Sequence, residues 1–206
     1  MEARLRAATD GDVDLIRWAL YEALAWNPKR ELPARDAVLA HPEASRYHVG
    51  WGRRGDIGVV ATADDETVGV AYCRLFTDAD HGHGFVDDRT PEVAVAVRDG
   101  WRGTGLGTRL MNRLADAART AGFQRLSLSV DTDNPARRLY ERLGYREVSV
   151  DDGGVRMLLE LSPRVSDRTN RTRELSARPA PDANAVRDAR RLAPRRVRRA
   201  GRETQT

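Results

Sequence analysis

The chain contains one cysteine, Cys73, and one lysine, Lys29, among its 206 residues. A single cysteine excludes an internal disulfide and fits a reducing compartment. No apolar run approaches the roughly 20 residues that a membrane-spanning helix needs. The first residues lead into no apolar signal core. We therefore expect a soluble, cytoplasmic protein that does not use a membrane. The excess of arginine over lysine fits a bacterial genome of high GC content.

Aromatic residues are also scarce, at 6%, whereas charged residues make up 32%. The charge is uneven, because residues 163–206 hold 13 arginines and five acidic residues, while residues 1–162 hold 22 basic and 26 acidic residues. The C-terminal segment contains no aromatic residue and has too little apolar surface to offset its ordering entropy. The composition predicts one folded domain over residues 1–162 and a disordered, arginine-rich tail over residues 163–206.

A basic tail is compatible with binding to nucleic acid or to another anionic surface. No aromatic side chain lies among its arginines to stack on bases, as single-stranded nucleic acid sites require. We therefore favour a solvated tail and regard nucleic acid as an unlikely partner. Steeply salt-dependent binding of DNA or RNA would support the opposite interpretation.

A glycine-rich segment lies between an expected strand and an expected helix. Valines alternate with other residues over Val93–Val97, which is typical of a strand, and leucines recur every fourth residue after Leu106, which is typical of a helix. Between them stand Gly103, Gly105 and Gly107, which let a ligand approach the main chain closely. The first amides of a helix have no partner within it. The segment therefore predicts a site for a phosphate or pyrophosphate.

Two common phosphate-binding motifs do not fit this segment. A Walker loop has the spacing of Gly100 and Gly105, but Leu106 stands where the lysine is needed. A dinucleotide fingerprint fails as well, because the glycine after Gly105 is already Gly107. The pattern that remains is Arg-Gly-x-Gly-x-Gly, beginning at Arg102, whose side chain adds a positive charge.

A second motif runs from Asn134 to Tyr145, after an apolar strand over Leu126–Val130. Asn134 is a good N-cap, and Pro135 suits the first helical position, where its missing N–H costs nothing. Gly144 suits the left-handed residue that follows a helix. The motif predicts a short helix of about nine residues between these two signals.

Together the two motifs resemble those of the GNAT superfamily of acetyl-CoA-dependent N-acetyltransferases, Arg/Gln-x-x-Gly-x-Gly/Ala and Asn-x-x-Ala-x-x-x-Tyr-x-x-x-Gly-Phe/Tyr. The likeness covers about residues 3–162, and its specific motifs lie between residues 92 and 145. It implies an α/β (α+β) fold, with a mixed central sheet flanked by helices in the order β-α-α-β-β-β-α-β-α-β-β. The periodicities agree with this order. The expected strands are Arg4–Ala8, Ile57–Thr62, Val68–Phe76, Val93–Val97, Leu126–Val130, Arg146–Val150 and Val155–Leu161. The expected helices are residues 10–26, 34–39, 106–121 and 135–143.

The resemblance implies acetyl-CoA as co-substrate. Its pyrophosphate would lie on the glycine-rich loop, and its pantetheine arm would lie beside the main chain of the preceding strand, which in this family carries a bulge and diverges from its neighbour. An arginine of the second motif could contact the phosphates or simply be solvated. The residues implied in coenzyme binding are Val95, Ala96, Val97, Arg102, Gly103, Thr104, Gly105, Leu106, Gly107, Thr108, Asn134 and Arg137.

The resemblance also implies the catalytic groups. The tyrosine of the second motif, here Tyr140, would protonate the departing thiolate, although an aromatic packed in the core explains it too. A lysine-type amine with a pKa near ~10.4 is mostly charged at neutral pH, so a general base is useful. Glu92 is our candidate base, and an exposed glutamate at a strand end is the alternative.

Other features leave the acceptor open. His81 and His83 lie in a glycine-containing loop without zinc-ligand spacing, so we expect no metal. The acceptor is an unidentified small-molecule amine or peptide, and homodimerisation remains open. The alternatives are a non-catalytic acetyl-CoA sensor on the same fold and an enzyme that uses another acyl-CoA.

Overall fold

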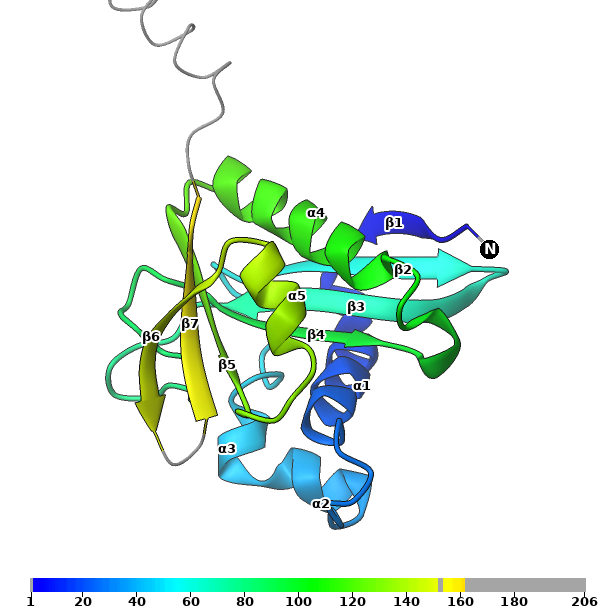
Figure 1. The fold of residues 1–206 in the computed structure, drawn as a ribbon, viewed down its shortest axis with the longest axis horizontal. Helices are drawn as coiled ribbons and strands as arrows, with labels where there is room; N and C mark the ends of the chain where they lie inside the picture. The colour runs from blue at the N-terminus through cyan, green and yellow to red at the C-terminus, as the bar shows by residue number, and fades with distance from the viewer. Residues whose placement is uncertain (1, 152–153, 162–206) are drawn as a thin grey trace, which may run out of the picture. The chain divides into compact units, whose positions relative to one another are not determined.

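The computed structural model describes residues 2–151 and 154–161. Its centre is a seven-stranded sheet in the order β1-β2-β3-β4-β5-β7-β6, in which only β4 and β5 pair in parallel (Figure 1). The strands are β1 Arg4–Ala7, β2 Ile57–Ala63, β3 Glu66–Arg74, β4 Glu92–Val97, β5 Arg125–Val130, β6 Arg146–Asp151 and β7 Gly154–Glu160. The helices are α1 Val13–Leu24, α2 Arg35–Ala40, α3 Pro42–Ser45, α4 Leu106–Thr120 and α5 Arg137–Arg142, with short 3-10 turns at Asp10–Asp12 and Asp99–Trp101.

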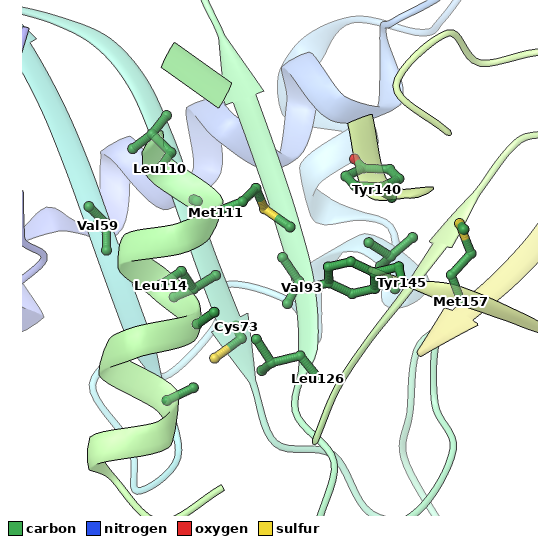
Figure 2. Packing of buried hydrophobic residues seen from close by; sticks show 14 of the residues in the cluster. Val59, Cys73, Val93, Leu110, Met111, Leu114, Leu126, Tyr140, Tyr145 and Met157 are labelled. Carbon is green, nitrogen blue, oxygen red and sulfur yellow. The ribbon is translucent and has the colours of Figure 1, made fainter. Parts of the chain in front are cut away.

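Helices cover both faces of the sheet, because its strands bury side chains on both sides. On one face, α4 and α5 pack against a cluster that includes Val93, Leu110, Leu126 and Tyr140 (Figure 2). On the other face, Ile16 of α1 packs with a second cluster on β2, β3 and β4. The side chains of β4 alternate between the two faces, so its odd-numbered residues face α4 and its even-numbered residues face α1.

The structure confirms the predicted mixed sheet and the expected order of the predicted elements, and it corrects some of their details. Helix α3 was not predicted from the sequence, although His41 caps it and Pro42 occupies its first position. The first turn before α1 is a 3-10 turn rather than α-helix. The predicted tail, residues 163–206, lies outside the described residues. Within the described part of the chain, no helix is both long and apolar enough to cross a membrane.

β4 and β5 pair at a single position, Glu92 with Ser127, and then diverge (Figure 1). The amide of Ser127 donates to the carbonyl of Pro91 at 3.0 Å, which joins the strands at their beginnings. Beyond this point β5 runs away from β4, and we call the unpaired region the β4–β5 separation. The family's bulge in this strand was expected but is not found here, because β4 keeps one continuous register with β3 from Glu92 to Val97.

Candidate active site

The glycine-rich loop joins the open end of β4 to α4 and leaves the N-terminus of α4 accessible. Gly105 caps α4 with a left-handed φ of 86°, and no side chain of the described residues accepts a hydrogen bond from the first amides. Gly103 also has a positive φ, 75°, and a Cβ built on either glycine would meet no atom within 4 Å. The free amides and the positive end of the helix dipole fit a phosphate group.

The other residues of the loop have different environments. Arg102 is exposed, with its Nε donating to the carbonyl of Val97 at 3.1 Å and its Nη1 2.9 Å from Asp99. The hydroxyl of Thr104 donates to the carbonyl of Trp101. Leu106 is buried, so its side chain anchors α4 in the core and only its main chain faces the loop. Gly107 and Thr108 are half-buried in the first turn of α4.

The main chain of β4 presents alternate residues to the β4–β5 separation. The amide of Arg98 donates to Val68 of the β3 side, so the amide of Ala96, two residues earlier, also faces β3. The main-chain groups of Val95 and Val97 face the opposite way, toward β5. Of the three residues expected to contact pantetheine through their main chain, Val95 and Val97 are oriented for that contact and Ala96 is not.

Asn134 and Arg137 are both engaged within the chain. The side-chain oxygen of Asn134 accepts the amide of Ala136 at 2.9 Å, as predicted for an N-cap. The first turn closes through i+3 hydrogen bonds, so the α-helix proper begins at Arg137, two residues later than predicted. The guanidinium of Arg137 forms ion pairs with Glu141 at 3.1 Å and Glu147 at 3.0 Å, which compete with a coenzyme phosphate.

Tyr140 lies on α5, on the α4 face of the sheet, where its ring centroid is 5.9 Å from that of Tyr145 (Figure 2). The helix ends in a Schellman arrangement, in which Tyr145 and Gly144 donate to the carbonyls of Tyr140 and Glu141. Tyr140 is 8% exposed, and burial raises the pKa of its hydroxyl to about 12. The phenol is therefore protonated at neutral pH.

Glu92 lies on the other face of the sheet, at the closed end of the β4–β5 separation. It is 4% exposed, so the alternative of an exposed strand-end glutamate is wrong. The hydroxyl of Tyr47 donates to Oε1 of Glu92 at 2.7 Å, whereas Oε2 is buried and has no hydrogen-bond partner in the described part of the chain. Burial raises the pKa of Glu92, and the hydrogen bond from Tyr47 opposes that rise, as does the nearby main-chain amide of Gly84.

Tyr47 was not predicted as a partner of Glu92, because 45 residues separate them and no local spacing connects them. The amide of His83 donates to the same hydroxyl at 3.1 Å. Gly82 and Gly84 cover the pair closely, since a Cβ on Gly82 would lie 2.6 Å from Oε2 of Glu92 and a Cβ on Gly84 would lie 2.8 Å from its side-chain carbons. These two glycines let the loop pack its main chain directly against the carboxylate.

An open pocket of about 440 Å³ is lined in part by this loop. Apart from Gly82, its lining residues are polar or charged, and they come from the α3 region, the loop at His81–His83, and the hairpin of β6 and β7. Arg46 and Arg156 contribute positive charge, and both are paired, with Asp80 at 3.4 Å and Asp151 at 3.4 Å respectively. Among the described residues there is no group of three potential metal ligands, including around His81 and His83.

Several curated and solved proteins that resemble this chain are acetyltransferases. Acetyltransferase Pat of Mycolicibacterium smegmatis is 40% identical over 73 residues, which cover 35% of this chain and only 22% of that protein. The GNAT domain of S. lividans PAT superimposes with a TM-score of 0.56 and 24% identity, over 77% of this chain and 90% of that one. The yncA protein of Salmonella typhimurium, solved with its cofactor acetyl-CoA, gives a TM-score of 0.52 and 25% identity, over 89% and 99% of the two chains.

The sequence profile of the acetyltransferase (GNAT) family matches residues 17–145, which include β4, the glycine-rich loop, α4 and α5. The match covers more than half of the chain and spans both motifs on which the resemblance was based. The chain therefore belongs to the acetyltransferase (GNAT) family.

Proposed function

We propose that this protein transfers an acetyl group from acetyl-CoA to a primary amine of a small molecule or peptide, by direct attack in a ternary complex. One observation carries the proposal: the uncapped N-terminus of α4 lies at the open end of the β4–β5 separation, and Glu92 lies at its closed end. This arrangement offers a phosphate site and a buried carboxylate along the same strand. Family membership and the acetyl-CoA bound to yncA support the choice of donor.

The loop and β4 would hold acetyl-CoA through main-chain groups. The amides at Gly103–Gly107 would bind the diphosphate, and the exposed guanidinium of Arg102 would add charge. The main chain of Val95 and Val97 would bind the pantetheine arm and stabilise the carbonyl oxygen as it gains negative charge. Asn134 would contact the arm through its side-chain amide, since its side-chain oxygen already caps the turn before α5.

Glu92 and Tyr140 would handle the two protons from opposite faces of the sheet. As the amine nitrogen forms its bond to the acetyl carbon, its proton passes to Glu92 through water. As the bond from carbon to sulfur breaks, Tyr140 donates its proton to the sulfur. The high pKa of Tyr140 keeps that proton in place until negative charge develops on the sulfur. Alignment of the two bound reactants supplies much of the remaining rate.

The acceptor would enter from the pocket beside His81–His83, which is on the Glu92 face. Gly82 and Gly84 pack against the buried carboxylate of Glu92, so the proton of the amine would reach it through water rather than by direct contact. The paired charges of the pocket suit a polar acceptor rather than an apolar one.

The first test is to incubate the protein with acetyl-CoA and a panel of amines, peptides and aminoglycosides while free thiol is measured. Thiol release that depends on an amine supports the proposal. Coenzyme binding without turnover on any acceptor would instead favour the sensor. Replacing acetyl-CoA with longer acyl-CoAs in the same assay identifies the donor.

The second test compares two glycines of similar geometry. Gly105 and Gly122 have φ values of 86° and 93°, and a Cβ on either would meet no protein atom. Alanine at either position therefore costs about 1–2 kcal/mol of backbone strain. Gly105→Ala should also weaken coenzyme A binding in calorimetry, because its methyl group projects into the proposed diphosphate site. Gly122→Ala, at the far end of α4, should not; equal affinities for the two variants would contradict the proposed site.

A further inference from the structure

A fully buried ion pair lies beside the Glu92 site. Arg74 ends β3 and stands directly opposite Glu92 in the register of β3 and β4. Its Nε and Nη2 donate to the two carboxylate oxygens of Asp56 at 2.9 and 2.7 Å, and the two side chains are 0% and 1% exposed. Arg74 therefore pairs with Asp56 rather than with the carboxylate opposite it.

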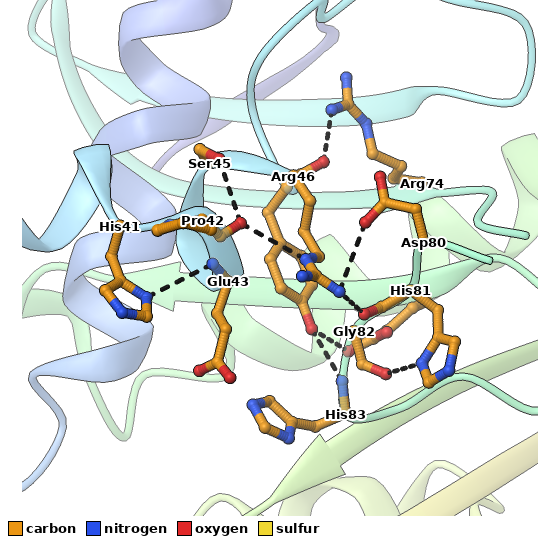
Figure 3. A network of polar contacts seen from close by, with 12 residues as sticks. His41, Pro42, Glu43, Ser45, Arg46, Arg74, Asp80, His81, Gly82 and His83 are labelled. Atoms are coloured by element: carbon orange, nitrogen blue, oxygen red, sulfur yellow. Dashed lines mark hydrogen bonds and ion pairs between the residues drawn. The ribbon is translucent and has the colours of Figure 1, made fainter. Parts of the chain in front are cut away.

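The remaining nitrogen of Arg74 holds the segment that carries Tyr47. Nη1 donates to the carbonyls of Arg46 and Val49, each at 2.8 Å. Figure 3 shows the guanidinium reaching the Arg46 carbonyl at the end of α3. These two carbonyls lie on either side of Tyr47 in the sequence, and they belong to turns that follow a helix end, where main-chain oxygens lack partners.

Asp56 fixes the other end of the same segment. Its carboxylate accepts the amides of Gly52 and Arg53 at 3.0 and 3.2 Å, in addition to the guanidinium of Arg74. One buried ion pair thus binds main-chain groups at positions 46, 49, 52 and 53. A bidentate guanidinium of this kind fixes geometry as well as charge.

We propose that Arg74 and Asp56 are positioning residues that hold the hydroxyl of Tyr47 on Oε1 of Glu92. Neither residue touches a reacting atom. Their effect on the reaction passes through Tyr47, whose ring is further held by edge-on contact with Phe76 at 5.2 Å. The effect of these residues on catalysis rests on the proposed function, in which Glu92 is the base. The structural link from Arg74 through Tyr47 to Glu92 is independent of that function.

Several charged or titratable groups face Glu92, and the test must separate them. Tyr47 approaches from the segment after α3, Tyr72 and Arg74 from β3, His83 from the covering loop, and Arg156 from β7. Lysine at position 74 retains the positive charge while it loses the forked geometry. A change of Glu92 titration in Arg74→Lys then reports the position of Tyr47, because Tyr72, His83 and Arg156 are unaltered and position 74 keeps its positive charge.

The experiment follows the side-chain carboxyl carbon of Glu92 by NMR as a function of pH, with Glu92→Gln to assign the signal. The variants are Tyr47→Phe, Arg74→Lys and the double variant. Loss of the Tyr47 hydrogen bond removes a stabilisation of the carboxylate, so Tyr47→Phe should raise the titration midpoint by about one pH unit. Arg74→Lys should raise it similarly, and the double variant should add nothing further. Arg6→Lys is the control, because Arg6 makes a bidentate pair with Asp12 at 2.7 Å on the edge strand β1.

An unchanged Glu92 titration in Arg74→Lys, together with a shifted one in Tyr47→Phe, would overturn the proposal. If Arg74→Lys does not fold, Asp56→Glu moves the same guanidinium while keeping its charge pair, and the same shift is expected. The acidic limb of kcat/KM is then measured for each variant. If the NMR midpoint moves and this limb does not, the positioning role stands and Glu92 is not the base.

Discussion

Tyr140 and Glu92 are both buried, but Tyr140 has apolar surroundings and Glu92 has polar ones. Tyr140 lies in an apolar cluster with Tyr145, and burial alone raises its pKa. Glu92 lies among polar groups, with the hydroxyl of Tyr47 on Oε1 and the main chain of Gly82 and Gly84 packed against the carboxylate. The first environment favours retention of a proton, and the second holds a carboxylate that can accept one.

We expect Tyr140→Phe to lower kcat by about 10²-fold or more, with little change in coenzyme A affinity, because a general acid acts only on the leaving group. Tyr145→Phe is a matched control, since its hydroxyl is buried in the same cluster without a hydrogen-bond partner in the described chain. It should keep kcat near that of the wild type. Steady-state kinetics and calorimetry provide the two measurements. Equal kcat values for the two variants would show that the Tyr140 hydroxyl has no role as an acid.

The raised pKa of Glu92 also predicts how the free energy of unfolding depends on pH. Its folded pKa lies above the ordinary value of 4.5, so the folded state keeps this proton to higher pH than the unfolded state. The contribution of Glu92 to the free energy of unfolding is fully present below its pKa in the unfolded state. It is lost as the pH rises through its pKa in the folded state. Glu92→Gln cannot titrate and retains an oxygen for Tyr47. Urea unfolding between about pH 5 and about pH 8 should show Glu92→Gln gaining stability relative to the wild type; a constant difference would contradict the assigned burial effect.

At the scale of elements, β4 carries the proposed coenzyme contacts through its main chain. Its amides should therefore divide into two sets in hydrogen exchange without ligand. Ala94 and Ala96 face β3 and should exchange slowly, whereas Val95 and Val97 face the β4–β5 separation and should exchange faster. Addition of coenzyme A should slow Val95 and Val97 selectively. Uniform protection along β4 before ligand is added would show that the strand is paired on both sides.

The sequence predicted these elements unequally well. The left-handed Gly144 and the capping side chain of Asn134 were both predictable, since each residue type acts locally. The start of the α-helix at Arg137 was not, because the choice between i+3 and i+4 closure depends on tertiary packing of the first turn. The hydrogen bond between Tyr47 and Glu92 could not be predicted either, because 45 residues separate the two side chains.

At the scale of the whole molecule, the divergence of β4 from β5 was predicted from the family resemblance. The periodicity of the sequence could not predict it. Alternating valines predict a strand but do not say where its pairing ends. The burial of Glu92 depends in the same way on Gly82 and Gly84, which sequence analysis treated only as parts of a polar loop. Long-range packing of main chain on a side chain leaves no periodic signal.

Residues 163–206 contain no aromatic residue and have too little apolar surface to build a core of their own. We therefore expect a chain that ends at residue 162 to keep the thermal unfolding midpoint and the coenzyme A affinity of the full chain. Binding of DNA at several salt concentrations should be compared for both lengths. Steeply salt-dependent binding by the full chain alone would assign a nucleic-acid role to the arginine-rich segment. A lower midpoint for the shorter chain would contradict independence of the domain.

The strict alternation of β4 has a consequence for how related genes can diverge. Glu92 faces one side of the sheet, while Val93, Val95 and Val97 face the other. Inserting or deleting one codon within this strand would turn every following side chain to the opposite face. Changes of length should therefore accumulate in the neighbouring loops, and β4 itself should vary only by substitution.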